Sequence, residues 1–432
     1  MVRYSKAFPT TTMDDAGSAF NQFSSSRMRS VEASAIVTPL ATGTPQVKGW
    51  CPGALRPMLS GDGLVLRVRP HGGRLSQAQA AGIAELAVQH GNGLLDLTSR
   101  ANLQIRGVQP SSQPALVEGL QALGLLDDSP EIEARRNILV SPFAQDGDGT
   151  TTLDAELAHA LAMPDAPPLP EKFGFSVDCG KHPVLRDSSA DIRIERAPGG
   201  FLVSAYGFAT GALVASADAV PAALDLARWY LAATAGHNPR GRMTRIAPYA
   251  TLPARFQTTA LPTPSTSTPQ VGPTANGWLV GIELGQLSAT TLATLSNMGD
   301  LRITPWRLLL IEGAHQTPEV CGLITHADDP RLRVVACIGA PGCLQGHTAT
   351  RHLARAMAPL VPVGRLLHVS GCAKGCAHPK DSLTLVGTPT GMNLVRYGKA
   401  SSAPDLQALA PETIAAYLTQ QFKSVTPHAS PI

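Results

Sequence analysis

The sequence lacks a long apolar run. No stretch of about 18 apolar residues occurs, so we expect no membrane-spanning helix. The net charge is only +3, too small to indicate nucleic acid or a membrane surface as a partner. A Gly-x-Gly-x-x-Gly turn between a strand and a helix is also missing, so no nicotinamide or flavin site of that kind is expected. With 44% hydrophobic residues, the 432-residue chain can still form two or three domains with sizeable cores.

The first 45 residues contain little that would fold or direct export. They are rich in Ser, Thr and Ala and lack the continuous apolar core of a signal peptide. We expect residues 1–48 to be disordered, and Met28 offers an alternative start. The odd count of seven cysteines argues against a disulfide scaffold, and nothing points to an oxidising compartment. The simplest expectation is a cytoplasmic protein.

Four of the cysteines form two pairs near the C-terminus. Cys337 and Cys343 lie in Cys-Ile-Gly-Ala-Pro-Gly-Cys, and Cys372 and Cys376 lie in Ser-Gly-Cys-Ala-Lys-Gly-Cys-Ala-His-Pro after a helical segment. Four thiolates in pairs of unequal spacing suit a 4Fe-4S cluster, because each iron takes one cysteine. Nearby glycines would let backbone N–H groups approach such a cluster closely. These glycines are Gly339, Gly342, Gly371 and Gly375.

Two other interpretations of these cysteines stay open. Structural zinc also takes four cysteines, but its paired ligands usually lie two to four residues apart. The five residues between Cys337 and Cys343 fit that spacing poorly. Disulfide bonds would need an oxidising compartment. The spacing therefore favours an iron–sulfur cluster.

Alternating residues predict strands in the first half of the chain. Residues 64–69 alternate apolar and charged, which places Arg67 and Arg69 on one face of a half-buried strand. A helix is expected over residues 76–89, with its first residue as the N-cap and Gly91 as its end.

Residues 94–107 alternate again and are predicted as one strand. That strand would present Arg100, Asn102 and Gln104 on one side. Considered alone, these polar positions are typical of a solvated sheet face.

The same strand, helix, strand order occurs twice. Residues 277–313 follow the pattern of residues 64–107, with Leu-Ser at the start of the helix, a Thr in the second strand and a Gly at its end. Internal duplication is the economical explanation. A larger α/β segment is expected after each copy, at about 131–250 and 331–422, and only the second contains the paired cysteines.

Together these features resemble the nitrite and sulfite reductase family. The resemblance rests on the cysteine pattern, on Thr98 with Arg100-Ala101-Asn102-Leu103-Gln104, on the Arg136-Asn137 corner and on the duplicated halves, and it covers roughly residues 49–425. It implies an α+β fold of duplicated nitrite/sulfite reductase-like architecture. The expected parts are a disordered segment (1–48), a ferredoxin-like half-domain (49–125), an α/β domain without a cluster (130–255), a Pro/Thr/Ser linker (256–276), a second ferredoxin-like half-domain (277–318) and a 4Fe-4S-binding α/β domain (330–425).

The resemblance also implies roles for individual residues. In that family siroheme and a 4Fe-4S cluster are coupled through a shared cysteine, which by position would be Cys376. The cluster ligands would be Cys337, Cys343, Cys372 and Cys376. The residues on the tetrapyrrole and substrate side would be Arg67, Arg69, Arg100, Asn102, Arg136 and Lys172, with Arg136 and Lys172 in catalytic roles.

One departure argues against a reductase. The family pattern places two lysines around Lys172-Phe173-Gly174-Phe175, and this chain has Gly174 where the second should be. Fewer cations at the substrate oxyanion weaken proton delivery to sulfite or nitrite. Three segments instead resemble the precorrin-3B synthase family of aerobic cobalamin biosynthesis. They are Trp-Cys-Pro-Gly-Ala-Leu-Arg-Pro-Met at 50–58, Ser-Gly-Asp-Gly-Leu at 60–64 and Gly-Cys-Ala-Lys-Gly-Cys-Ala-His-Pro at 371–379.

That second resemblance implies a monooxygenase. Its substrate would be the tetrapyrrole precorrin-3A, which dioxygen hydroxylates at C20 while a γ-lactone closes. Arginines suit the many carboxylates of this substrate, because guanidinium groups bind carboxylates in pairs of hydrogen bonds and stay charged. An external NADH-linked electron donor is implied as a partner, and a mononuclear non-haem iron beside the cluster would activate oxygen.

The ligands of that iron do not follow from the sequence. Two histidines and a carboxylate would suit oxygen activation. His326 and Asp328 have the local spacing, and His347, His368 and His378 lie near the paired cysteines, but each is equally consistent with a structural histidine. Lys374 and Lys380 would neutralise the charge of the cluster.

Two other function classes stay open. A siroheme-dependent sulfite or nitrite reductase is the alternative enzyme, and a strong haem-like absorption would favour it. A non-enzymatic electron-transfer subunit or a zinc-stabilised interaction module is the third.

Overall fold

Two antiparallel sheets, one of five strands and one of six, exchange their edge strands. The computed structural model describes residues 51–235, 242–262 and 268–424. Each sheet takes its last strand from the other half of the sequence. The first sheet contains, in order, β1 (Met58–Ser60), β2 (Gly63–Val68), β5 (Leu103–Val108), β4 (Leu94–Leu97) and β14 (Gln286–Ser288). The second contains β12 (Gly272–Thr274), β13 (Gly277–Ile282), β16 (Leu308–Glu312), β15 (Leu301–Ile303) and β3 (Arg74–Leu75), and β17 (Leu323–Ile324) also pairs with β13.

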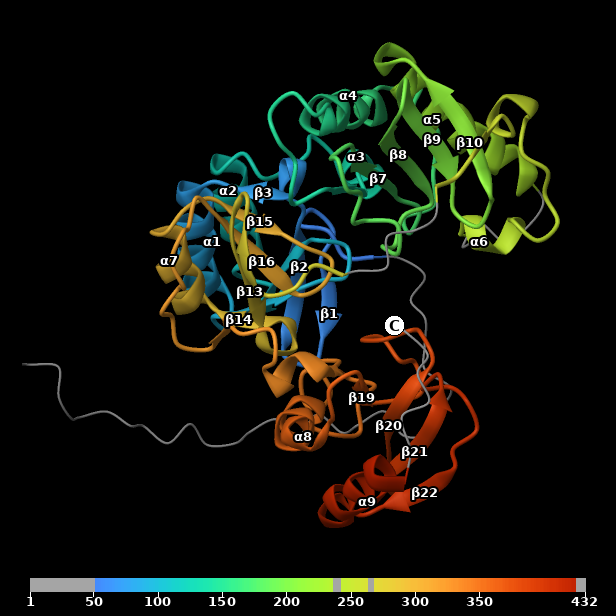
Figure 1. Cartoon of the computed structure of the whole chain (residues 1–432). Helices are drawn as coiled ribbons and strands as arrows, with labels where there is room; N and C mark the ends of the chain where they lie inside the picture. Colours follow the sequence, from blue (N-terminus) through green and yellow to red (C-terminus); the bar gives the residue numbers. More distant parts are fainter. Residues whose placement is uncertain (1–50, 236–241, 263–267, 425–432) are drawn as a thin grey trace, which may run out of the picture. The chain divides into compact units, whose positions relative to one another are not determined.

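Three helices pack beside these sheets (Figure 1). Helix α1 (Gln77–His90) contacts both α2 (Gln113–Ala122) and α7 (Ala289–Ser296). The predicted start and end of α1 are confirmed, because Ser76 forms a capping box with Gln79 and Gly91 is the C-cap. Buried apolar residues of both sheets and of these helices form one continuous core.

The segment predicted as one strand from 94 to 107 is two strands. β4 and β5 pair antiparallel, and a turn over residues 98–102 joins them. The Thr98 hydroxyl accepts the N–H groups of Arg100 (3.3 Å) and Asn102 (3.2 Å), and Ala101 has φ 51°. Alternation does not reveal a turn closed by a side-chain hydroxyl. Arg100 and Asn102 therefore lie in a turn and not on a strand face.

A mixed six-stranded sheet follows the first half. Its strands β6, β7 and β8 are parallel and the others antiparallel. Helices α4 (Thr150–Ala162) and α5 (Ser216–Ala233) pack on it, and Phe173 stacks 4.7 Å from Tyr230 of α5. The order is β11 (Thr259–Ala260), β10 (Thr210–Val214), β9 (Gly200–Ala205), β8 (Ile192–Ala197), β7 (Phe175–Asp178) and β6 (Ile138–Val140), and the short helices are α3 (Pro130–Arg135) and α6 (Met243–Ile246).

The C-terminal sheet has five strands. Its strands β18, β19 and β20 are parallel, and β21 and β22 are antiparallel. Residues of α8 (Thr350–Met357) and α9 (Pro411–Ser424) complete its core. The order is β18 (Val334–Ala336), β19 (Leu367–Ser370), β20 (Ser382–Thr388), β21 (Gly391–Gly398) and β22 (Leu406–Leu409).

The two α/β sheets share one topology, three parallel strands followed by antiparallel ones. This likeness supports internal duplication, which stays a prediction, as do the domain boundaries. The predicted linker 256–276 includes β11 and β12, while its residues 263–267 and the predicted disordered segment 1–48 lie outside the described residues. None of the helices in the described ranges is long and apolar enough to cross a membrane.

Candidate active site

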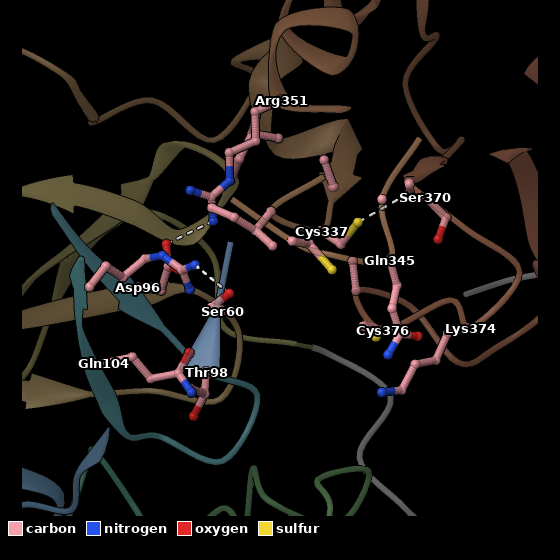
Figure 2. Close-up of a pocket in the computed structure, with 18 of the residues that line it drawn as sticks. Ser60, Asp96, Thr98, Gln104, Cys337, Gln345, Arg351, Ser370, Lys374 and Cys376 are labelled. Carbon is pink, nitrogen blue, oxygen red and sulfur yellow. Dashed lines mark hydrogen bonds and ion pairs between the residues drawn. The ribbon is translucent and has the colours of Figure 1, made fainter. Parts of the chain in front are cut away.

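A cavity of about 440 Å³ is lined by all four paired cysteines. One wall comes from the first sheet, with Ser60, Asp96, Thr98 and Gln104, and the opposite wall comes from the cysteine loops (Figure 2). Cys337 directly follows β18, and Cys372 comes two residues after the end of β19. Both cysteine loops therefore begin at the carboxyl edge of these parallel strands. Ligand sites of α/β sheets are usually found at that edge.

Backbone hydrogen bonds tie the two cysteine loops together. The N–H of His347 donates to Gly371 O (2.9 Å), and the N–H of Gly371 donates to the Sγ of Cys337 (3.2 Å). A Cβ added at Gly371 would lie only 3.2 Å from the Cα of Gly339. Glycine backbone of the two cysteine loops is therefore closely packed, while the approach of its N–H groups to a cluster stays a prediction.

The residues present fit a 4Fe-4S cluster. Burial raises the pKa of the Cys372 thiol, and the charges of Cys343 and Cys337 raise it further because these thiols lie close by. Within residues 51–235, 242–262 and 268–424, no group of three or more His, Cys, Asp or Glu is placed to hold a single metal ion. A cluster has a different requirement, because each cysteine binds a different iron. The donor set suits a cluster better than one zinc ion.

The turn after β1 positions the first cysteine loop. The Ser60 hydroxyl and the Gly61 N–H both donate to Gly342 O, at 2.6 and 3.1 Å. A Cβ added at Gly61 would lie 2.0 Å from Pro341 O, so only glycine permits this contact. Asp62 in the same turn pairs with Arg106 (2.6 Å).

The buried carboxylate of Asp96 joins three parts of the chain. It accepts from Arg106 of β5 (3.2 Å), from Gln286 of β14 (3.1 Å) and from Arg351 of α8 (2.7 Å). Figure 2 shows the contact between Asp96 and Arg351 beside Cys337. This single side chain therefore links the first sheet to the helix that follows the first cysteine loop.

Three comparisons with known proteins bear on the fold and the family of this chain. A family model described as a nitrite/sulfite reductase ferredoxin-like half domain matches residues 56–123. The solved structure of the Mycobacterium tuberculosis NirA protein has a TM-score of 0.63 at 15% identity and covers 85% of this chain and 81% of that chain, which shows a shared fold. A curated precorrin-3B synthase from Sinorhizobium sp is 31% identical over 398 residues, covering 83% of this chain and 84% of that protein. The chain belongs to the precorrin-3B synthase family.

Membership of the precorrin-3B synthase family confirms the resemblance found in the sequence. The nitrite/sulfite reductase-like fold is confirmed by the NirA likeness. For this member of the family, the structure also shows which of the predicted binding residues face the cavity.

Two of the predicted basic residues line the cavity. Arg67 of β2 is only 9% exposed, and its Nε has no hydrogen-bond partner among the described residues. Burial and the charge of Arg69 together lower the pKa of Arg67 to about 10. Lys172 is exposed at the rim, and its carbonyl accepts from Arg100 (2.8 Å). Arg100 thus positions the Lys172 backbone and lines a small recess with Asn102 outside the main cavity.

Arg69 and Arg136 are not among the described residues that line the cavity. Arg69 is buried against Glu133 (3.2 Å), and Arg136 pairs with Asp127 (2.7 Å). The alternation placed Arg67 and Arg69 on one face of a strand, but β2 ends at Val68, so Arg69 lies beyond the strand. Gly174 is also not among the described residues that line the cavity, and its N–H donates a hydrogen bond to the Asp191 carboxylate (3.0 Å).

The candidate histidines and carboxylate do not form one metal site in the described part of the chain. His368 is fully buried in β19, and its ring lies 5.8 Å from that of His378. His347 lines a separate pocket of about 220 Å³ behind Cys372, and neither His326 nor Asp328 is among the described residues that line either cavity. The residues described here do not fit a mononuclear iron site, and we assign no step to such an iron.

Three cavity arginines were missed in the sequence. Arg106 lies two residues after Gln104 on β5, so the two side chains point to the same side of the strand. Continuing the predicted alternation to the next polar position would have found Arg106. Arg307 and Arg351 carry no comparable signal, because one lies in a turn and the other at the start of a short helix.

A second cavity of about 750 Å³ lies along α4, in the part of the chain without the paired cysteines. Asp154 of α4 lines it and is only 8% exposed. Burial raises the pKa of Asp154 to about 6, against the opposing effects of the Arg136 charge and the Gly72 N–H. The ionised form is disfavoured in the folded protein, so stability falls as the pH rises from about 4 through 6.

Replacing Asp154 by Asn should therefore stabilise the protein at high pH. We expect Asp154→Asn to raise the free energy of unfolding by about 2–3 kcal/mol at pH 8 and by little at pH 4. Chemical denaturation at the two pH values measures this. Glu156→Gln, at an exposed position of the same helix, is the control and should have little effect. Equal stabilisation at both pH values would contradict the pKa argument.

Proposed function

We propose that this chain is a precorrin-3B synthase that hydroxylates precorrin-3A at C20 with dioxygen and closes a γ-lactone. The observation that carries the proposal is one cavity lined both by four cysteines and by several basic side chains. A polycarboxylate tetrapyrrole needs such cations, and electrons must reach it from an adjacent donor. One oxygen atom of dioxygen enters the C20 hydroxyl and the other leaves as water, so electrons must come from a separate NADH-linked donor.

The chain's own residues would bind and orient the macrocycle. Arg67 and Lys172 offer positive charge to its carboxylates at one wall. Leu97, Leu284 and Leu344 provide apolar surface for the ring and exclude water from it. Cys337, Cys343, Cys372 and Cys376 would hold a 4Fe-4S cluster, which supplies single electrons when bound. Cys376 is the most exposed of the four, consistent with its predicted position facing the tetrapyrrole.

Purification without air provides the first test of this function. Iron, sulfide and zinc are measured, and absorption spectra are recorded before and after precorrin-3A is added. We expect a brown protein without a haem-like band and a substrate-dependent spectral change. With labelled dioxygen and a reductant, the product should gain one labelled oxygen by mass spectrometry. A strong siroheme-like band without oxygen incorporation would instead return the chain to the sulfite and nitrite reductases.

Arg67 lies in β2 and Arg69 lies just after it, and we expect substitution of the two arginines to have different effects. Arg67→Gln should weaken precorrin-3A binding by about tenfold to a hundredfold, because a charged hydrogen bond contributes about 1.5–3 kcal/mol. Arg69→Gln should instead lower the free energy of unfolding by about 3–5 kcal/mol, because it leaves the buried Glu133 carboxylate without its cation. Substrate titration and chemical denaturation separate the two effects. A stable Arg67→Gln protein with unchanged affinity would remove Arg67 from the binding site.

A further inference from the structure

Two arginines that line the cavity beside the cysteines are only partly paired within the described residues. Arg307 and Arg351 contribute three buried nitrogen atoms without a hydrogen-bond partner in the described part of the chain. These atoms are Nη1 of Arg307 and both Nε and Nη1 of Arg351. A buried donor without a partner costs about 1–3 kcal/mol, and more when it is charged. An anion bound in the cavity would remove that cost.

A turn of unusual conformation holds Arg307 in place. The Thr304 hydroxyl accepts the N–H groups of Trp306 (3.3 Å) and Leu308 (3.2 Å), as Thr98 does in the first half. Arg307 has φ 63°, at the place where the first half has Ala101. This left-handed conformation costs about 1–2 kcal/mol for a residue other than glycine. Such strain is often found at functional sites.

The Arg307 guanidinium is anchored on the second cysteine loop. Its Nη2 donates to the carbonyl of Ala377 (3.1 Å), the residue after Cys376. Burial and the charge of Arg351 lower the pKa of Arg307 to about 10, against the opposing effects of the charges of Asp96 and Cys337. The positive charge of Arg307 is therefore close to both Arg351 and the cysteines.

Charge at this end of the cavity does not balance. Arg351 donates to Asp96 (2.7 Å), but that carboxylate is already shared with Arg106 (3.2 Å). Arg106 also pairs with Asp62 (2.6 Å). Three arginines, including Arg307, thus face two carboxylates, so one of the three positive charges is not matched by a carboxylate of these ion pairs.

We propose that Arg307 and Arg351 form a carboxylate site that couples substrate binding to reduction of the cluster. This inference rests on the proposed function. Reduction adds a negative charge to a cluster, and nearby cations stabilise that charge. A substrate carboxylate on the arginine pair cancels part of the positive charge, so it lowers the midpoint potential of the cluster. By linkage, reduction of the cluster weakens carboxylate binding by the same factor.

Midpoint potentials of the full-length, cluster-loaded protein test this coupling. The cluster is titrated with dithionite and followed by electron paramagnetic resonance, with and without uroporphyrin III, a stable tetrapyrrole with carboxylates on every ring. Affinity for uroporphyrin III and precorrin-3A is measured on the oxidised protein. The variants are Arg307→Gln and Arg351→Gln. Arg355→Gln is the control, because Arg355 lies one turn further along α8 and pairs with Glu283 outside the cavity.

In the wild type, uroporphyrin III should lower the potential by about 59 mV or more, which matches a tenfold weaker affinity of the reduced protein. Both variants should have a lower potential without ligand, lose most of the shift and bind the tetrapyrroles at least about tenfold more weakly. The control should behave as wild type. If Arg307→Gln does not retain a cluster, the result for Arg351→Gln alone tests the coupling.

Two other outcomes separate this inference from the proposed function. A full shift and unchanged affinity in the variants would overturn the role of the arginine pair and leave the proposed function standing. Failure of the wild type to bind either tetrapyrrole would overturn the proposed function and this inference with it.

Discussion

Replacing Cys376 by Ser should remove the cluster. Serine is a poor ligand for iron, and Cys376 lines the cavity with the other three cysteines. We expect the iron and sulfide content to fall by more than about tenfold, with loss of the brown colour and of hydroxylation. Metal analysis and absorption spectra of anaerobically purified protein measure this.

Cys321→Ser is the matched control for this substitution. Cys321 is exposed and is not among the described residues that line the cavity. Its replacement should leave iron, sulfide and colour unchanged. Retention of a full cluster in Cys376→Ser would show that the fourth ligand is a different residue, and the proposed donor set would be wrong.

Replacing Gly339 by Ala should disrupt the first cysteine loop. Gly339 has φ 63°, and an added Cβ would lie 2.5 Å from both Thr348 O and the Thr350 hydroxyl. Backbone cannot yield to such a contact without moving the loop. Strain at positive φ and overpacking together predict a loss of about 2–5 kcal/mol of stability, with loss of the cluster.

Substitution of Gly364 distinguishes backbone strain at positive φ from crowding by the added Cβ. Gly364 has φ 76°, but no described atom lies within 4 Å of an added Cβ. Gly364→Ala should therefore cost only the backbone strain, about 1–2 kcal/mol, and retain iron. Thermal denaturation and iron analysis of both variants compare these effects. If the two substitutions had equal effects, crowding around Gly339 would not be important for the loop.

The sequence predicted features with strong local signals. Ser76 and Gly91 marked the ends of α1 because capping is a local property of the chain. The cysteine spacing predicted a shared site, and the four side chains do line one cavity. Family membership followed from motifs that include the turn at Ser60 and Gly61, which packs on the first cysteine loop.

Features that depend on distant contacts could not be predicted in this way. Arg69 is a basic residue near the right position, but its carboxylate partner, Glu133, comes from far along the sequence. Arg136 pairs with the nearby Asp127, and neither the alternation nor the motifs indicated that pair. Nothing local to Arg307 indicates that its turn would place it beside Cys337. Residue type alone therefore did not distinguish a basic side chain that binds substrate from one in an internal ion pair.

The exchanged edge strands β3 and β14 make folding a property of nearly the whole chain. β4 gains its outer neighbour only after residues 286–288 have been synthesised, and β15 pairs with residues that lie far earlier. Pairing across such sequence distances makes contact order high and folding slow. A fragment truncated before β14 would expose an open strand edge and aggregate. Assembly of the proposed iron–sulfur site should therefore be a late event, after both halves have folded together.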